Sequence, residues 1–187
     1  MSDPVESFEY RGYQVEIIYD HDAEDPLNGY DDVKLYAPHR RYRFGNVNHD
    51  APKGTRIKVP VYMYDHSGLA VSTTPFSCPW DSGRLGTMFI ENEDLKNIDT
   101  GDEMDYLMSV FSEWSYYVSG EAYCLDISLR GEVIESISGH FGLDGVKEAA
   151  RDTIDMHITT EHMARQSEIG RMERSGLVEA FQLARYA

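Results

Sequence analysis

Apolar and polar positions alternate in several stretches of the chain, and this period of two predicts β-strands. Strands are expected over residues 13–19, 55–64 and 123–129. A turn at Arg130-Gly131 leads to a further strand over 132–138, so the last two strands form a hairpin. Because Pro60 has no amide hydrogen to donate, the strand that contains it is expected at a sheet edge or at a bulge.

Turn residues separate the shorter strands. Asp65-His66-Ser67-Gly68 begins with Asp and ends with Gly, as a type I turn prefers, and joins the second strand to a short one over residues 69–72. Another short strand is expected over 86–90. Residues 20–32 are rich in Asp, with turns marked by Pro26 and Asn28-Gly29, and we expect them to form an acidic surface loop.

Apolar residues spaced three and four apart predict helices in the second half of the chain. The first has one apolar face, made of Met104, Leu107, Met108, Phe111, Trp114 and Val118. Thr100 and Glu103 have the spacing of a capping box, and Gly120 is suited to end the helix in a left-handed conformation. A second helical pattern begins at Asp144, and a further helix is expected over 177–186.

These elements predict an α+β protein with a mainly antiparallel sheet, one packed central helix and a helical C-terminal extension. We divide the chain into an α+β domain over residues 1–144 and an extension over 145–187. No apolar run approaches the roughly 20 residues of a membrane span, and the N-terminus lacks a signal-peptide core. We therefore expect a soluble protein of the cytoplasm that binds no membrane.

Acidic residues outnumber basic ones, and the excess is unevenly distributed. The chain of 187 residues has 33 Asp and Glu against 17 Lys and Arg, a formal charge of −16. Residues 1–36 have a net charge of −8 and residues 91–144 of −11, whereas residues 37–60 have +5. Because nucleic acids and anionic membranes are held through basic surfaces, direct nucleic-acid binding is not expected.

The two acidic blocks suggest a more specific role. Duplex DNA presents one negative charge per about 1.7 Å of its axis, so a rigid carboxylate surface can occupy a basic nucleic-acid channel on another protein. Solubility, or adaptation to high salt, explains such runs equally well. The candidate partner-binding residues are Asp20, Asp22, Glu24, Asp25, Asp31, Asp32, Glu91, Glu93, Asp94, Asp99, Asp102, Glu103 and Asp105.

The turn-rich centre contains the residue types of a catalytic site. His66, Cys78 and Asp81 supply an imidazole, a thiol and a carboxylate, which makes a hydrolase or a metal-dependent enzyme an alternative function. The segment lacks a G-x-S-x-G elbow and the common metal-binding spacings, so we predict neither catalytic residues nor a cofactor. We expect Trp80 and Phe76 to cover the core, and Cys78 and Cys124 to stay unpaired.

Two segments in this centre are specific enough to suggest a relationship. They are Tyr64-Asp65-His66-Ser67-Gly68 and Thr74-Pro75-Phe76-Ser77-Cys78-Pro79-Trp80-Asp81-Ser82-Gly83, followed by a Gly-x-x-x-Ile pattern from Gly86. Residues 13–145 resemble an uncharacterised family of phage and mobile-element proteins that has this motif. The resemblance implies an origin and a host-cell cytoplasmic location, and it implies no activity and no site residues.

Origin and charge together favour a non-enzymatic, acidic binding protein of a phage or mobile element. The sharpest form of this hypothesis is a counter-defence inhibitor that mimics nucleic acid on a host nucleic-acid-binding complex. A third hypothesis, of a different class, is a structural or assembly protein that forms homo-oligomers through its C-terminal helices.

Overall fold

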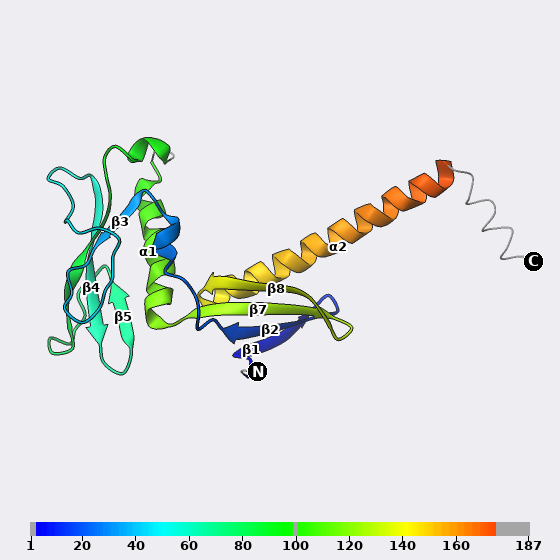
Figure 1. Ribbon diagram of the computed structural model, residues 1–187, viewed down its shortest axis with the longest axis horizontal. Helices are drawn as coiled ribbons and strands as arrows, with labels where there is room; N and C mark the ends of the chain where they lie inside the picture. Colours follow the sequence, from blue (N-terminus) through cyan, green and yellow to red (C-terminus); the bar gives the residue numbers. More distant parts are fainter. Residues whose placement is uncertain (1–2, 99–100, 175–187) are drawn as a thin grey trace, which may run out of the picture.

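The computed structural model describes residues 3–98 and 101–174. Two antiparallel four-stranded sheets lie next to each other, joined by helix α1 (Glu103–Ser119), and helix α2 (Leu143–Arg174) lies against one of them (Figure 1). This arrangement confirms the predicted α+β class with a packed central helix and a C-terminal helix. The antiparallel strands are divided between two sheets.

The first sheet combines an N-terminal hairpin with a second hairpin that lies more than one hundred residues later in the sequence. Its strands are β1 (Glu6–Tyr10), β2 (Tyr13–Tyr19), β7 (Ala122–Leu129) and β8 (Glu132–Phe141), in the order β1-β2-β7-β8. The central pairing joins β2 to β7, so the N-terminal hairpin lies beside the C-terminal one. Strands β2, β7 and β8 were predicted from the sequence, whereas β1 was not.

The second sheet comes entirely from the intervening residues. It contains β3 (Val33–Tyr36), β4 (Ile57–Asp65), β5 (Leu69–Ser72) and β6 (Ser82–Ile90), in the order β3-β6-β4-β5. Strand β3 was not predicted, and β6 begins four residues before the predicted start at Gly86. The hairpin of β4 and β5 is confirmed.

Pro60 lies in β4, which is an inner strand of the second sheet. The register with β6 shifts between Val61 and Tyr62, which confirms the predicted bulge. On its other side β4 pairs with β5 only from Tyr62 to Asp65. Pro60 therefore lies beyond the end of β5, where the missing amide hydrogen breaks no ladder bond.

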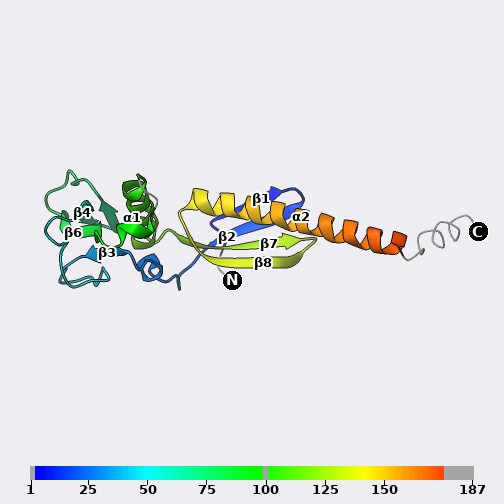
Figure 2. The same cartoon turned by 90° about the horizontal axis from the view of Figure 1, so that it is seen from above.

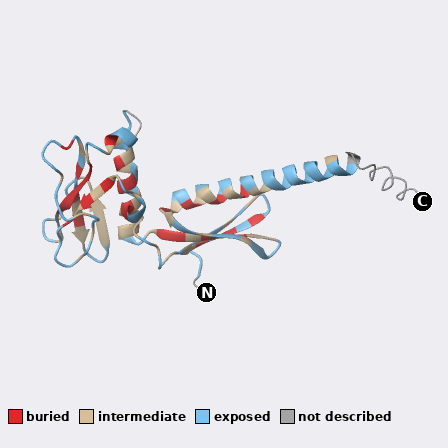
Figure 3. Ribbon diagram, turned by 45° about the horizontal axis from the view of Figure 1, so that its top comes forward, coloured by how far each residue is buried: buried red, intermediate tan, exposed pale blue. Residues whose placement is uncertain are grey.

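Each sheet has its own hydrophobic core (Figure 3). Helix α1 covers the second sheet with a face that includes Leu107 and Trp114, both fully buried. The first turns of α2 cover the first sheet with the equally buried Val146, Ala150 and Ile154. The apolar periodicity thus predicted most of the buried face of α1, although Met104 is 40% exposed and the buried Val110 was not included.

Helix α2 has 32 residues and is therefore about 48 Å long, more than the first sheet can cover. It lies along that sheet and continues beyond it (Figures 1 and 2). Met156 and Met163, each 66% exposed, are on its uncovered surface. The boundary at residue 144 remains a prediction, although the first turns of α2 clearly complete a core. The helix expected over 177–186 lies outside the described residues.

Helix α1 begins and ends close to the predicted positions. Its first residue is Glu103, whose side chain accepts a hydrogen bond from the Gly101 amide at 3.1 Å. The predicted capping box needs Thr100 as the N-cap and Glu103 as the third helical residue, and it is wrong because Asp102 is the N-cap. Thr100 itself lies outside the described residues. Gly120 ends the helix with a φ of +78°, which confirms the left-handed cap. Neither described helix has the length and apolar character needed to cross a membrane.

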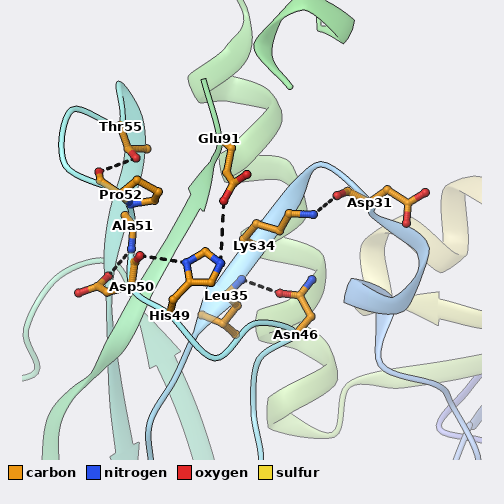
Figure 4. Close-up of polar contacts among 10 residues, drawn as sticks. All are labelled: Asp31, Lys34, Leu35, Asn46, His49, Asp50, Ala51, Pro52, Thr55 and Glu91. Carbon is orange, nitrogen blue, oxygen red and sulfur yellow. Dashed lines mark hydrogen bonds and ion pairs between the residues drawn. The ribbon is translucent and has the colours of Figure 1, made fainter. Parts of the chain in front are cut away.

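Strand β3 is held at the edge of its sheet by a loop instead of by another strand. The Asn46 side chain accepts from the Leu35 amide at 2.7 Å (Figure 4). It also donates to the Val33 carbonyl at 2.9 Å. Side-chain groups therefore satisfy the backbone at an otherwise open edge. On β6, Gly86 approaches Tyr36 so closely that an added Cβ would lie 1.8 Å from the Tyr36 carbonyl oxygen.

Candidate functional site

Two of the predicted acidic segments meet at one end of the second sheet. The pairing of Val33 with Ile90 brings Asp32, which precedes β3, and Glu91, which follows β6, to the same end of the sheet. The Tyr106 hydroxyl donates to Asp32 at 3.0 Å, so the first turn of α1 lies at the same end. We call this surface the acidic end, and its residues are Asp31, Asp32, Glu91, Glu93, Asp94, Asp102, Glu103 and Asp105. Asp99 lies outside the described residues.

The basic groups near the acidic end leave most of its charge unneutralised. Lys34 donates to the backbone carbonyl of Asp31, not to a carboxylate (Figure 4). The His49 Nε2 lies 4.0 Å from a carboxylate oxygen of Glu91, and this pair is ionic only when the imidazole is protonated. Lys96 in the short helix η2 (Leu95–Asn97) and Arg56, which precedes β4, bring two further positive charges to this end. Among the described residues, the eight carboxylates are still in excess, and exposed pairs of this kind contribute little.

Two tyrosines fix the side chains behind this surface. Tyr30 donates to Glu113 at 2.6 Å, and the Tyr30 and Tyr106 rings meet edge to face with centroids 6.3 Å apart. The hydrogen bond to Glu113, reinforced by burial, raises the pKa of Tyr30 to about 12. Burial, together with the bond to Asp32, raises the pKa of Tyr106 to about 12.

The remaining predicted acidic residues, Asp20 to Asp25, do not join the acidic end. Asp20 accepts from the Gly139 amide at 3.1 Å, beside the first sheet. Asp25 accepts from the Leu27 amide at 2.9 Å and caps the short helix η1 (Pro26–Gly29), and burial raises its pKa. Asp22 and Glu24 are exposed in the same connection. The first acidic block is therefore divided between two places.

A second acidic surface lies on the outer side of the first sheet, and sequence reasoning missed it. Glu16 on β2 is directly opposite Asp126 on β7. Burial, followed by the nearby carboxylates of Asp20 and Asp126, raises the pKa of Cys124 to about 11. Alternation placed Glu16 and Asp126 at polar strand positions, but only the strand pairing brings them together.

The residues of the alternative enzyme hypothesis also converge. His66 Nδ1 lies 3.2 Å from Asp81 Oδ2, and the Cys78 thiol donates to the same oxygen at 3.7 Å. The Asp65 amide donates to the Asp81 carbonyl at 2.8 Å and joins the two turns. Trp80, however, is 91% exposed, so the expectation that it covers the core is wrong.

The chemistry of this cluster does not favour a cysteine nucleophile. Activation of a thiol calls for direct contact with an imidazole or a cation, whereas the Cys78 thiol contacts the Asp81 carboxylate, and His66 contacts that same carboxylate. Within the described residues, no three His, Cys, Asp or Glu side chains are grouped so as to hold a metal ion. Both cysteines are free thiols, as expected.

Comparisons with protein-family models, with curated proteins and with solved structures find no match to this chain.

Proposed function

We propose that this chain is a protein-binding module whose acidic end occupies the basic, nucleic-acid-binding surface of a host protein. Such a module acts by blocking the surface and needs no catalytic group. The resemblance of its turn motif to phage and mobile-element proteins suggests an inhibitor of host defence. Charge complementarity is expected to make association fast and strongly dependent on salt.

The observation that carries this proposal is the pairing of β3 with β6. It joins carboxylates about sixty residues apart in the sequence, since Asp32 and Glu91 come to the same end of the sheet. The paired strand ends next to both residues fix the backbone from which they extend, so less backbone entropy remains to be lost on binding. A charge run that served solubility alone would not need such a scaffold.

Affinity capture from host lysate tests the proposal when it is combined with a matched pair of variants. The first variant neutralises three exposed residues of the acidic end, Glu93→Gln, Asp102→Asn and Asp105→Asn. The second makes the same change of charge on exposed positions of α2, Glu148→Gln, Asp152→Asn and Glu161→Gln.

We expect the unchanged protein to capture a nucleic-acid-binding protein that excess duplex DNA releases. The acidic-end variant should bind the purified partner at least about tenfold more weakly, a loss of about 1.4 kcal/mol, while the α2 variant binds normally. Recovery of no nucleic-acid-binding protein at low and at physiological salt contradicts the proposal. Equal losses in the two variants contradict it as well.

A further inference from the structure

A cavity of about 310 Å³ opens at the end of the second sheet that is opposite the acidic end. Strand β6 connects the two places, because its first residues line the cavity and its last residue, Ile90, precedes Glu91. We call it the turn cavity, and it is lined by His39, Met63, Asp65, Trp80, Asp81, Ser82, Gly83, Arg84 and Leu85.

Two carboxylates are held rigidly in the wall of the turn cavity. The backbone hydrogen bond from Asp65 to Asp81, 2.8 Å long, fixes the two turns against each other. The Asp65 Oδ2 atom accepts from Tyr42 and contacts Arg41, while the Asp81 Oδ2 atom contacts His66. In the described part of the chain, these contacts all engage Oδ2, and both residues line the cavity, so in the proposal below we assign the other carboxylate oxygen of each to a ligand.

Aromatic and apolar groups complete the wall. Trp80 exposes 91% of its surface, which is unusual for an indole that lines a cavity. His39 stacks on Tyr42 with centroids 5.3 Å apart, and its Nδ1 accepts two backbone amides at 3.3 Å. Met63 and Leu85 are buried and form an apolar part of the lining.

The cations near the cavity are already engaged. The guanidinium of Arg84 bonds to the Gly86 carbonyl at 3.5 Å and to Thr87 at 3.2 Å, further along β6 than the two carboxylates. Arg41 contacts Asp65 at 3.1 Å, and its side chain is 73% exposed. An exposed pair of this kind contributes little stability and is easily exchanged. It also shows that the Asp65 carboxylate binds a guanidinium in the folded protein.

We propose that the turn cavity binds the guanidinium of an arginine side chain from a partner protein. Asp81 and the second oxygen of Asp65 accept its N–H groups. A planar guanidinium can donate to two carboxylates at once in a fixed geometry, which a lysine ammonium does less well. The Trp80 ring provides a cation–π contact, and Met63 and Leu85 contact the methylene groups. This site is separate from the acidic end and does not depend on its proposed function.

Fluorescence of the full-length protein tests the site directly. The chain has two tryptophans, Trp80 at 91% exposure and Trp114 at 0%, so a ligand at the cavity changes Trp80 emission selectively. The probe is N-acetyl-arginine methylamide, and N-acetyl-citrulline methylamide is its uncharged control of the same shape. A Trp80→Phe variant identifies the source of the signal, and because Trp80 is exposed its replacement leaves folding intact.

We expect the arginine probe to give a saturable change that is absent from Trp80→Phe and at least about tenfold weaker with citrulline. Asp81→Asn should weaken it by a similar factor, whereas Asp152→Asn on α2 and the acidic-end variant should bind normally. Equal responses to both probes, or no saturable response, overturn the proposal. Tighter binding of adenosine monophosphate than of the arginine probe also overturns it, because the cavity would then be selective for a nucleotide.

Discussion

Glu16 on β2 lies directly opposite Asp126 on β7, so two carboxylates face each other across the central pairing of the first sheet. Like charges in this position oppose strand pairing by roughly 0.2–1 kcal/mol. The Ser136 hydroxyl donates to Asp126 at 2.5 Å and compensates only one member of the pair. The first sheet therefore keeps a repulsive contact at its centre, on the face that α2 does not cover.

Replacing Glu16 with Gln should stabilise the protein. Removing one charge relieves the repulsion, so we expect the free energy of unfolding to rise by roughly 0.2–1 kcal/mol in urea titrations at low salt. The gain should shrink in high salt, which screens exposed charges. Glu9→Gln is the control, because Glu9 on β1 is opposite the uncharged Gln14 and accepts its side-chain hydrogen bond. A loss of stability in Glu16→Gln contradicts this account.

Gly86→Ala should be strongly destabilising. The new Cβ would meet the Tyr36 carbonyl oxygen at 1.8 Å, and neither backbone can move without disturbing the pairing of β3 with β6. Overpacking of this kind costs about 1–3 kcal/mol or more, measurable as a lower midpoint of thermal unfolding. Gly83→Ala lies in the same strand with no atom within 4 Å of its added Cβ, and it should unfold almost normally. Equal effects in the two variants would show that β3 does not pack here.

Two tyrosines should titrate late at alkaline pH. The folded protein raises the pKa of Tyr30 and Tyr106 from 10.0 to about 12, so both favour their neutral form. Their contribution to stability is complete below pH 10.0 and is lost as the pH rises through about 12. Ultraviolet absorbance of tyrosinate should reveal a late phase that Tyr30→Phe and Tyr106→Phe each reduce. A late phase unchanged in both variants would mean that other tyrosines account for it.

The thiol of Cys124 should react slowly. Burial and the carboxylates of Asp20 and Asp126 raise its pKa to about 11, and the thiolate is the reactive form. In a Cys78→Ser protein, alkylation by iodoacetamide at neutral pH should be much slower when folded than in denaturant. Asp126→Asn should raise the folded rate only partly, because burial is the larger cause. If folded and unfolded proteins react equally fast, the thiol is neither buried nor near those charges.

Local patterns predicted the elements that have strong periodicity, and the reasons are visible in particular residues. Helix α1 and the strands β2, β4 and β7 alternate or repeat in the way that a buried face requires. Strand β3 has four residues and follows an acidic loop, so its periodicity is too short to detect. Its backbone is held partly by the Asn46 side chain, a tertiary contact that no local pattern contains.

The candidate surfaces were predictable in composition but not in arrangement. The sequence shows that Asp32 and Glu91 belong to acidic blocks, yet the pairing of β3 with β6 decides that they meet. Tertiary contacts also separate Asp20 from Asp32, although only a short loop lies between them, because Asp20 accepts a hydrogen bond from Gly139 beside the first sheet. For Trp80 the aromatic side chain suggested the core, and its position in an exposed turn overrides that preference.

The first sheet also constrains the order in which the parts of this chain fold during synthesis. Ile17 pairs with Leu125, so the hairpin of β1 and β2 emerges from the ribosome 108 residues before its partner strand. At about 5–20 residues per second, it waits for several seconds with one face uncovered. The whole second sheet and α1 lie between these two strands in the sequence, so they are able to fold during that interval. The slow, long-range step of folding is therefore the closing of the first sheet, with α2 arriving last to cover it.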